Sequence, residues 1–203
     1  MQRRAERRLV TCVFVDVVGS TDLTVELGPE RMQRSLDRAF QRISVAAAAH
    51  GGTIEKYIGD AVFMLFGAPV ARADDPERAL RTAEACVAEA GGAGPASALA
   101  VRVGVETGEA LVDLDAIGRD RQRMVLGACV NLAARLQSQA GPGQVLVGPT
   151  CYAATAHLAR FEELGHRELK GLGEVPVRRL VRVTGAPAPT PLPFIGRAAE
   201  LAA

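Results

Sequence analysis

Two aspartates that each follow an apolar run are candidates for holding a metal ion. Asp16 lies at the end of the apolar run that opens VTCVFVDVVGST, residues 10–21, and Asp60 follows Gly59 between two β-type runs. An unpaired buried carboxylate is costly, so it is normally paired, hydrogen-bonded or bound to a metal. If the two strands are neighbours, the two carboxylates favour a divalent cation, which prefers hard oxygen ligands. Two unrelated turn residues are the alternative, because aspartate is common in turns.

The turn after Asp16 offers a place for phosphate. Ser20 and Thr21 follow Gly19 and are typical of an N-cap that opens a helix. The free backbone N–H groups at such a helix end suit phosphate oxygens. A strand, a carboxylate and an anion-binding turn together predict a metal–nucleotide site.

Four further polar residues interrupt apolar segments. Lys56 lies in a β-type run four residues before Asp60, and Arg102 interrupts the strand-like LAVRVGVETG. Each of these side chains either reaches the surface or binds a ligand anion. Asn131 and Arg135 are four residues apart and therefore share one helical face. They form either a solvent-facing pair or a contact to a sugar and a phosphate.

The elements that must position these residues follow from periodicity and turn residues. Helices are expected over residues 22–50, with an interruption at Gly28-Pro29, and over 74–90, 125–138 and 150–158. Strands are expected over 10–16, in a hairpin within 52–69, over 99–106, 110–114, 144–148, 161–169 and 176–183, with a turn at Gly108 and a loop at 115–123. This intermingling predicts an α+β fold with a ferredoxin-like βαββαβ core, in which helices pack on a largely antiparallel central sheet.

Length and composition predict one soluble domain. We expect a basic tail at 1–8, a folded domain at 9–183, and a proline-rich linker at 184–203. A net charge of +1 gives no reason to expect a nucleic-acid partner. No apolar run is long enough for a membrane span or a signal peptide, so we expect a cytoplasmic protein without a membrane partner. The four cysteines are far apart and are interpreted as reduced packing residues.

Five motifs in order resemble the class III nucleotidyl cyclases. They are FVDVVGST, KYIGDAVFMLFG, VRVGVETGE, LGACVNLAARLQ and RELKGLGEVPVRRL. The resemblance covers residues 8–183, and the order of all five is far more specific than any one of them. It implies conversion of ATP or GTP to the 3′,5′-cyclic monophosphate and pyrophosphate.

The resemblance also implies roles for individual residues. Asp16 and Asp60, with the backbone carbonyl of Val17, match the ligands of two metal ions per site, Mg²⁺ or Mn²⁺. Lys56 matches the lysine that recognises the purine, and Arg102 matches an arginine that binds the terminal phosphates.

The remaining matched residues act across a dimer in this family. Asn131 matches the ribose-orienting asparagine, and Arg135 matches the arginine that stabilises the transition state. Because the metal ligands come from one subunit and this pair from the other, the resemblance implies a head-to-tail homodimer with composite sites. The monomer is expected to be inactive.

Two residues depart from the family pattern. Met124 stands at the second purine-selecting position, where a polar residue is usual, and a thioether is a poor hydrogen-bond partner. Ala128 stands where an aspartate is usual. We favour an active adenylyl cyclase because Lys56 is retained. The alternatives are a degenerate cyclase-fold module that regulates an attached domain, and a dinucleotide cyclase, against which the absence of a GGDEF-type turn argues. The segment LPFIGRAAELAA resembles the start of an ATPase domain that follows some cyclase domains; a disordered tail is the alternative.

Overall fold

The computed structural model describes residues 5–90, 99–113 and 125–185. Met124, the expected loop at 115–123 and most of the expected linker at 184–203 lie outside these residues. The elements in chain order are β1 Ala5–Val17, α1 Ser20–Leu27, α2 Pro29–Ala49, β2 Thr53–Ile58, β3 Ala61–Phe66, α3 Asp75–Ala90, β4 Val101–Asp113, β5 Val125–Leu126, α4 Ala128–Gln139, β6 Val145–Val147, α5 Pro149–Thr155, β7 Ala159–Leu169 and β8 Gly173–Val183.

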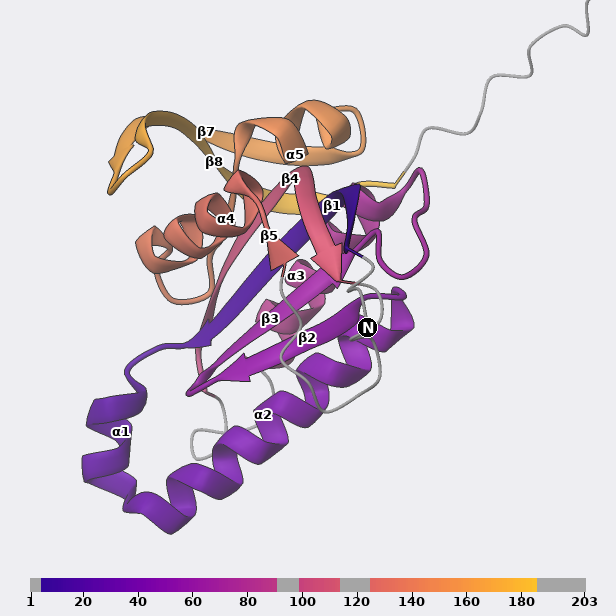
Figure 1. Cartoon of the computed structure of the whole chain (residues 1–203). Coiled ribbons are helices and arrows are strands. Elements are labelled where there is room, and N and C mark those ends of the chain that lie inside the picture. The colour runs from indigo at the N-terminus through magenta and orange to yellow at the C-terminus, as the bar shows by residue number, and fades with distance from the viewer. Residues whose placement is uncertain (1–4, 91–98, 114–124, 186–203) are drawn as a thin grey trace, which may run out of the picture.

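One sheet organises these elements (Figure 1). Its strand order is β2-β3-β1-β4-β6-β8-β7, with β5 paired to β4. The first four strands are antiparallel and, with the helices between them, form the predicted βαββαβ core. Strands β4 and β6 are parallel, and α4 lies in the connection between them, as a parallel pair requires. The predicted α+β class is confirmed.

Side chains alternate between the two faces of β1 and build two layers of core. Val13, Val15 and Val17 pack in one apolar cluster with residues of α2, α3 and α5. Cys12 and Phe14 belong to a second cluster, which α4 covers on the other face of the sheet. Because a strand has a two-residue period, the continuous apolar run at 10–15 is buried on both sides.

The expected helical region at 22–50 is two helices. Gly28 separates them with φ of 79°, a conformation that favours glycine, and Pro29 begins α2. Helix α2 buries Met32, Ile43 and two alanines, whereas α1 buries no residue and projects away from the sheet (Figure 1). No helix among the described residues is long and apolar enough to cross a membrane.

Two expected boundaries in the core are wrong. The expected turn at Gly108 is absent, because β4 continues unbroken from Val101 to Asp113. A Cβ at Gly108 would lie 2.9 Å from the Cβ of Cys129, so this glycine makes room for α4 rather than a turn. Val125 does not begin the helix: it lies in β5, and α4 begins at Ala128.

The basic start of the chain is not a tail throughout residues 1–8. Strand β1 begins at Ala5, so Arg7 and Arg8 lie within the sheet. Arg8 donates a hydrogen bond to the Pro69 carbonyl at 2.8 Å, and Arg7 pairs with Glu109 at 3.4 Å. Cross-strand pairing with β4 therefore extends the sheet over half of the residues expected to be solvated.

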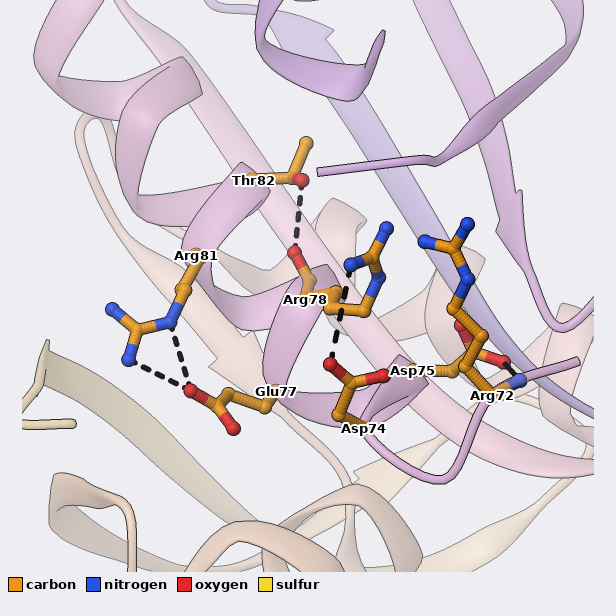
Figure 2. A network of polar contacts seen from close by, with 7 residues as sticks. All are labelled: Arg72, Asp74, Asp75, Glu77, Arg78, Arg81 and Thr82. Carbon is orange, nitrogen blue, oxygen red and sulfur yellow. Dashed lines mark hydrogen bonds and ion pairs between the residues drawn. The ribbon is translucent and has the colours of Figure 1, made fainter. Parts of the chain in front are cut away.

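A polar network fixes the start of α3 (Figure 2). The Asp75 carboxylate accepts a hydrogen bond from the Arg72 backbone N–H at 2.7 Å. Arg81 donates two bonds to Glu77 at 2.9 and 2.7 Å, one helical turn away. These contacts fix the first turns of α3. The opposite side of this helix packs against β1 and β4.

Candidate active site

The two candidate metal ligands lie at one end of neighbouring strands. Asp16 is the penultimate residue of β1 and is paired with Ala61, the first residue of β3. Asp60 lies in the turn before β3, and its carbonyl accepts a hydrogen bond from the Val17 N–H at 3.3 Å. The pairing of β1 with β3 thus brings the backbone of Asp16, Val17 and Asp60 together.

Asp16 is almost buried and is held by donors from two other elements. Arg102 stands directly opposite on β4 and approaches the Asp16 Oδ2 through its Nε at 2.7 Å and its Nη2 at 2.6 Å. Gln137 on α4 donates its Nε2 to the same oxygen at 3.0 Å. Arg102 also donates to the Ser138 carbonyl at 3.4 Å. The buried carboxylate is therefore neutralised and hydrogen-bonded, as its 8% exposure demands.

Gln137 is a site residue that the sequence reasoning missed. It lies in the predicted helix at 125–138, where no role in the site was assigned to it. The spacing nevertheless carries a signal: Gln137 is four residues after the fully buried Ala133, so its polar side chain faces the sheet rather than solvent. A polar residue on such a face needs a partner, and the partner is Asp16.

The turn after β1 begins helix α1 differently from the expectation. Gly19, not Ser20 or Thr21, is the N-cap, with φ of 68° and no side-chain cap. Ser20 is the first helical residue, and its hydroxyl donates to the Asp60 carboxylate. The first helical hydrogen bond comes from the Leu23 N–H to the Gly19 carbonyl at 2.9 Å. The N–H groups of the first turn therefore lie beside the two aspartates, at the positive end of the helix.

Three further predicted site residues, Lys56, Asn131 and Arg135, are exposed. Lys56 lies on the edge strand β2 and has no polar partner among the described residues. Asn131 and Arg135 lie on the solvent side of α4, whereas Gln137 faces the sheet. One chain therefore presents Asn131 and Arg135 away from its own Asp16.

The described residues alone do not enclose a metal ion. They contain no group of three or more histidine, cysteine or acidic side chains that could hold one. The carboxylates of Asp16 and Asp60 and the Val17 carbonyl are nevertheless hard oxygen donors on adjacent backbone, which fits Mg²⁺ or Mn²⁺. Such an ion usually keeps waters or substrate phosphates for its other positions, so an incomplete protein set is what this chemistry needs.

Comparison with known proteins gives one family. Residues 3–180 match the family model described as the adenylate and guanylate cyclase catalytic domain. "Adenylate cyclase 1" of Rhizobium meliloti is 32% identical over 177 residues, which cover 83% of this chain and 27% of that protein. An uncharacterised protein of the same organism is 37% identical over 178 residues, 83% of this chain and 17% of its own length. The chain thus spans less than a third of these two relatives.

Solved structures agree with the fold. The adenylyl cyclase CyaB from P. aeruginosa superimposes with a TM-score of 0.77 at 28% identity, covering 88% of this chain and 96% of that one. The guanylyl cyclase Cya2 gives 0.75 at 29% identity, covering 93% and 98%. The guanylate cyclase domain of RhGC from Catenaria anguillulae reaches 0.80 at 21% identity, covering 88% and 100%. These neighbours include both adenylyl and guanylyl cyclases.

Proposed function

This chain belongs to the adenylate and guanylate cyclase catalytic domain family, and we propose that it converts ATP, and less readily GTP, to the 3′,5′-cyclic monophosphate and pyrophosphate. We further propose that it works as a head-to-tail homodimer that needs Mg²⁺ or Mn²⁺. The observation that carries the proposal is the division of the site. Asp16 and Asp60 meet beside the first turn of α1, whereas Asn131 and Arg135 are exposed on α4.

Asp16, Asp60 and the Val17 carbonyl would hold the metal ions. When bound, such ions would lower the pKa of the ribose 3′-hydroxyl and neutralise negative charge on the triphosphate. The pairing of β1 with β3 places these three oxygen donors at neighbouring strand ends, where they could bind the ions together. Ser20 fixes one of these ligands through its hydroxyl bond to Asp60.

The first turn of α1 and Arg102 would bind the triphosphate. The N–H groups that follow Gly19, those of Ser20 and Thr21 among them, offer donors to phosphate oxygens, and the helix dipole favours the negative charge. Arg102 carries a fixed positive charge beside them. Because it is bonded to Asp16 in this structure, it must release that carboxylate to reach the terminal phosphates.

Asn131 and Arg135 would complete the site of the partner subunit. Asn131 orients the ribose so that the 3′-oxygen lies in line with the departing pyrophosphate. Arg135 offsets the negative charge that accumulates on the phosphoryl oxygens in the transition state, much as an arginine finger does. Their shared exposed face leaves both free to enter a second subunit.

The preference for ATP is based on Lys56. Its exposed ammonium is the purine-recognising group that the family pattern assigns, and Met124 adds no hydrogen bond to discriminate the purines. Met124 and Ala128 together favour the alternative function, a degenerate cyclase-fold module that dimerises or binds nucleotide and regulates an attached domain.

Cyclic-nucleotide production by the purified chain tests this function. ATP and GTP are supplied separately with Mg²⁺ or Mn²⁺, and the oligomeric state is measured on the same sample. We expect cyclic AMP to be the main product. Asp16→Asn should reduce its formation at least about a hundredfold, because even the mutation of a residue that only hydrogen-bonds to a metal ligand lowers metal affinity or activity 10–100-fold. The matched control is Asp37→Asn, an exposed aspartate of α2, which should retain full activity. Absence of product from a chain that is demonstrably dimeric would support the degenerate module instead.

A further inference from the structure

Two cysteines from distant parts of the chain lie side by side beneath α4. Cys12 lies in the central strand β1 and Cys129 in the first turn of α4, and their sulfur atoms are 3.9 Å apart. All four cysteines are buried and unbridged, as the sequence predicted, but Cys86 and Cys151 have no such thiol neighbour. We propose that Cys12 and Cys129 are a modification site, at which a peroxide forms a reversible disulfide.

The sheet and the helix hold this pair in place. Cys12 stands opposite Glu106 on β4, two residues before Gly108. Since a Cβ on Gly108 would meet the Cys129 Cβ at 2.9 Å, the bare glycine allows the start of α4 to approach the sheet. A disulfide has its sulfur atoms about 2 Å apart, so the two thiols must approach each other by about 2 Å. Cys129 is the second residue of its helix, where the backbone adjusts more easily than in the middle.

Disulfide formation needs one thiol that ionises and reacts with the oxidant first, and Cys129 is that thiol. The hydrogen bond with Cys12 and backbone N–H groups at the start of α4 lower the pKa of Cys129, although burial opposes them. The same thiol contact and burial raise the pKa of Cys12. Burial raises the pKa of both Cys86 and Cys151 to about 12. Cys129 is therefore the thiol that most readily becomes a thiolate, the form that reacts with oxidants.

A small oxidant has a route to Cys129. A cavity of about 430 Å³ is bordered by Cys129, Leu132, Thr150 and Leu172. Hydrogen peroxide is far smaller than this space, whereas Cys12 is fully buried behind Cys129 and does not line the cavity. The geometry therefore sets the order of the two steps: Cys129 reacts with peroxide first, and Cys12 reacts second.

The chemistry balances with peroxide as the oxidant. The Cys129 thiolate attacks one peroxide oxygen and forms an S–O bond while the O–O bond breaks. The departing hydroxide takes up the proton that the Cys129 thiol had released, which gives the first water. Cys12 then attacks the sulfenic sulfur, the S–O bond breaks, and the Cys12 proton leaves with the hydroxyl as the second water. Two thiols lose two electrons in total, and one peroxide is reduced to two waters.

The bond would tie the first turn of α4 to the central strand. Asn131 is two residues beyond Cys129 on that helix, so a pull on the first turn changes the position of its side chain. We expect oxidation to lower turnover; that consequence rests on the proposed function, whereas the formation of the bond does not.

Mass spectrometry of the whole chain tests the bond without any activity measurement. The reduced chain is treated with a few equivalents of hydrogen peroxide, quenched, and then denatured in N-ethylmaleimide. We expect alkylation to fall from four cysteines to two, with one peptide pair linked through Cys12 and Cys129. Dithiothreitol should restore all four alkylated sites. Cys86→Ala is the matched control and should form the same link.

Other oxidation products would overturn the proposal. Four alkylated cysteines after treatment, a link that involves Cys86 or Cys151, or a link between two chains would each do so. Cys12→Ala should leave a sulfenic acid on Cys129 that dimedone traps. Because the main measurement uses the unmodified chain, a variant that fails to fold does not hide the result, and an inactive chain can still give the expected link.

Discussion

At the residue scale, Asp16 shows how a buried carboxylate is paired and hydrogen-bonded. Its carboxylate is nearly buried, yet it has both a counter-charge from Arg102 and an amide donor from Gln137. Removing one partner of such a pair is costly, because it leaves a charge that water cannot solvate fully. A divalent cation that binds Asp16 would take over the role of the guanidinium. Metal binding and the Arg102 contact are therefore expected to compete.

The first prediction concerns this competition. Arg102→Met removes the charge and keeps much of the side-chain length. Because Arg102 is one-third exposed, we expect a loss of about 2 to 3 kcal/mol in the free energy of unfolding, less than for a fully buried pair. Added Mn²⁺ should raise the urea midpoint of the variant more than that of the wild type, because the ion restores positive charge beside Asp16. Urea denaturation with and without Mn²⁺ measures both effects.

Arg179→Met provides the control. Arg179 pairs with Glu162 across β7 and β8 at 2.7 Å, but both side chains are well exposed. Its replacement should cost less than about 1 kcal/mol, and Mn²⁺ should not distinguish it from the wild type. An equal response of Arg102→Met and the wild type to Mn²⁺ would argue against a shared place for the ion and the guanidinium.

At the scale of elements, Glu106 connects β4 to α5. Its carboxylate accepts a hydrogen bond from the Thr150 N–H at 3.1 Å, at the start of α5. Gly148 allows this approach, because a Cβ there would lie only 2.0 Å from the Glu106 Oε2. Burial raises the pKa of Glu106 from its ordinary 4.5 to about 7, and the bonds from Thr150 only partly oppose it. The link between the two elements therefore depends on pH.

This pKa gives the second prediction. Between pH 4.5 and 7 the unfolded chain has released the proton that the folded chain still holds, so stability falls as pH rises through this window and then levels off. Glu106→Gln cannot ionise and should lack this slope. We expect the wild type to lose up to about 3 kcal/mol relative to the variant between pH 4.5 and 7.5. Urea denaturation at several pH values measures the difference, and parallel curves for the two proteins would contradict it.

The third prediction tests the contact between α4 and β4. A Cβ at Gly104 would lie 2.1 Å from the Ala133 carbonyl oxygen and 2.3 Å from the Gln137 nitrogen. Gly104→Ala should push the helix away and cost at least about 2 kcal/mol of unfolding free energy. It should also weaken the bond from Gln137 to Asp16. Thermal denaturation compares this variant with Gly141→Ala. The new Cβ of Gly141→Ala would meet only the flexible Gln144 side chain, so this control should lose little stability. Equal melting temperatures would show that α4 tolerates the shift.

The sequence predicted elements better than the contacts between them. Periodicity found the helices and strands of the core, and Gly28-Pro29 correctly separated α1 from α2. Gly108 was wrongly predicted as a turn, because a glycine that admits a neighbouring helix looks the same in sequence as one that bends the chain. Gln137 was missed because its partner Asp16 is 121 residues away, a distance that no local pattern spans.

At the scale of the whole molecule, α4 carries functional candidates on two opposite sides. Its sheet-facing side carries Gln137, which contacts Asp16 of the same chain, while its exposed side carries Asn131 and Arg135. Under the proposed function, a single chain therefore offers two separated half-sites. A two-fold dimer places the same patch on both subunits and can join each half-site to its complement.

The last prediction tests whether the site is shared between subunits. Asp60→Asn removes a proposed metal ligand and Arg135→Ala removes the proposed transition-state arginine, so each homodimer should be nearly inactive. Random pairing of the two variants makes half of the dimers mixed, and each mixed dimer has one intact site and one doubly defective site. Co-refolding them in equal amounts should therefore restore about a quarter of the wild-type activity. The readout is cyclic-nucleotide production together with the fraction of mixed dimer. If mixed dimers form but stay inactive, both sets of residues act within one chain, and the head-to-tail arrangement is wrong.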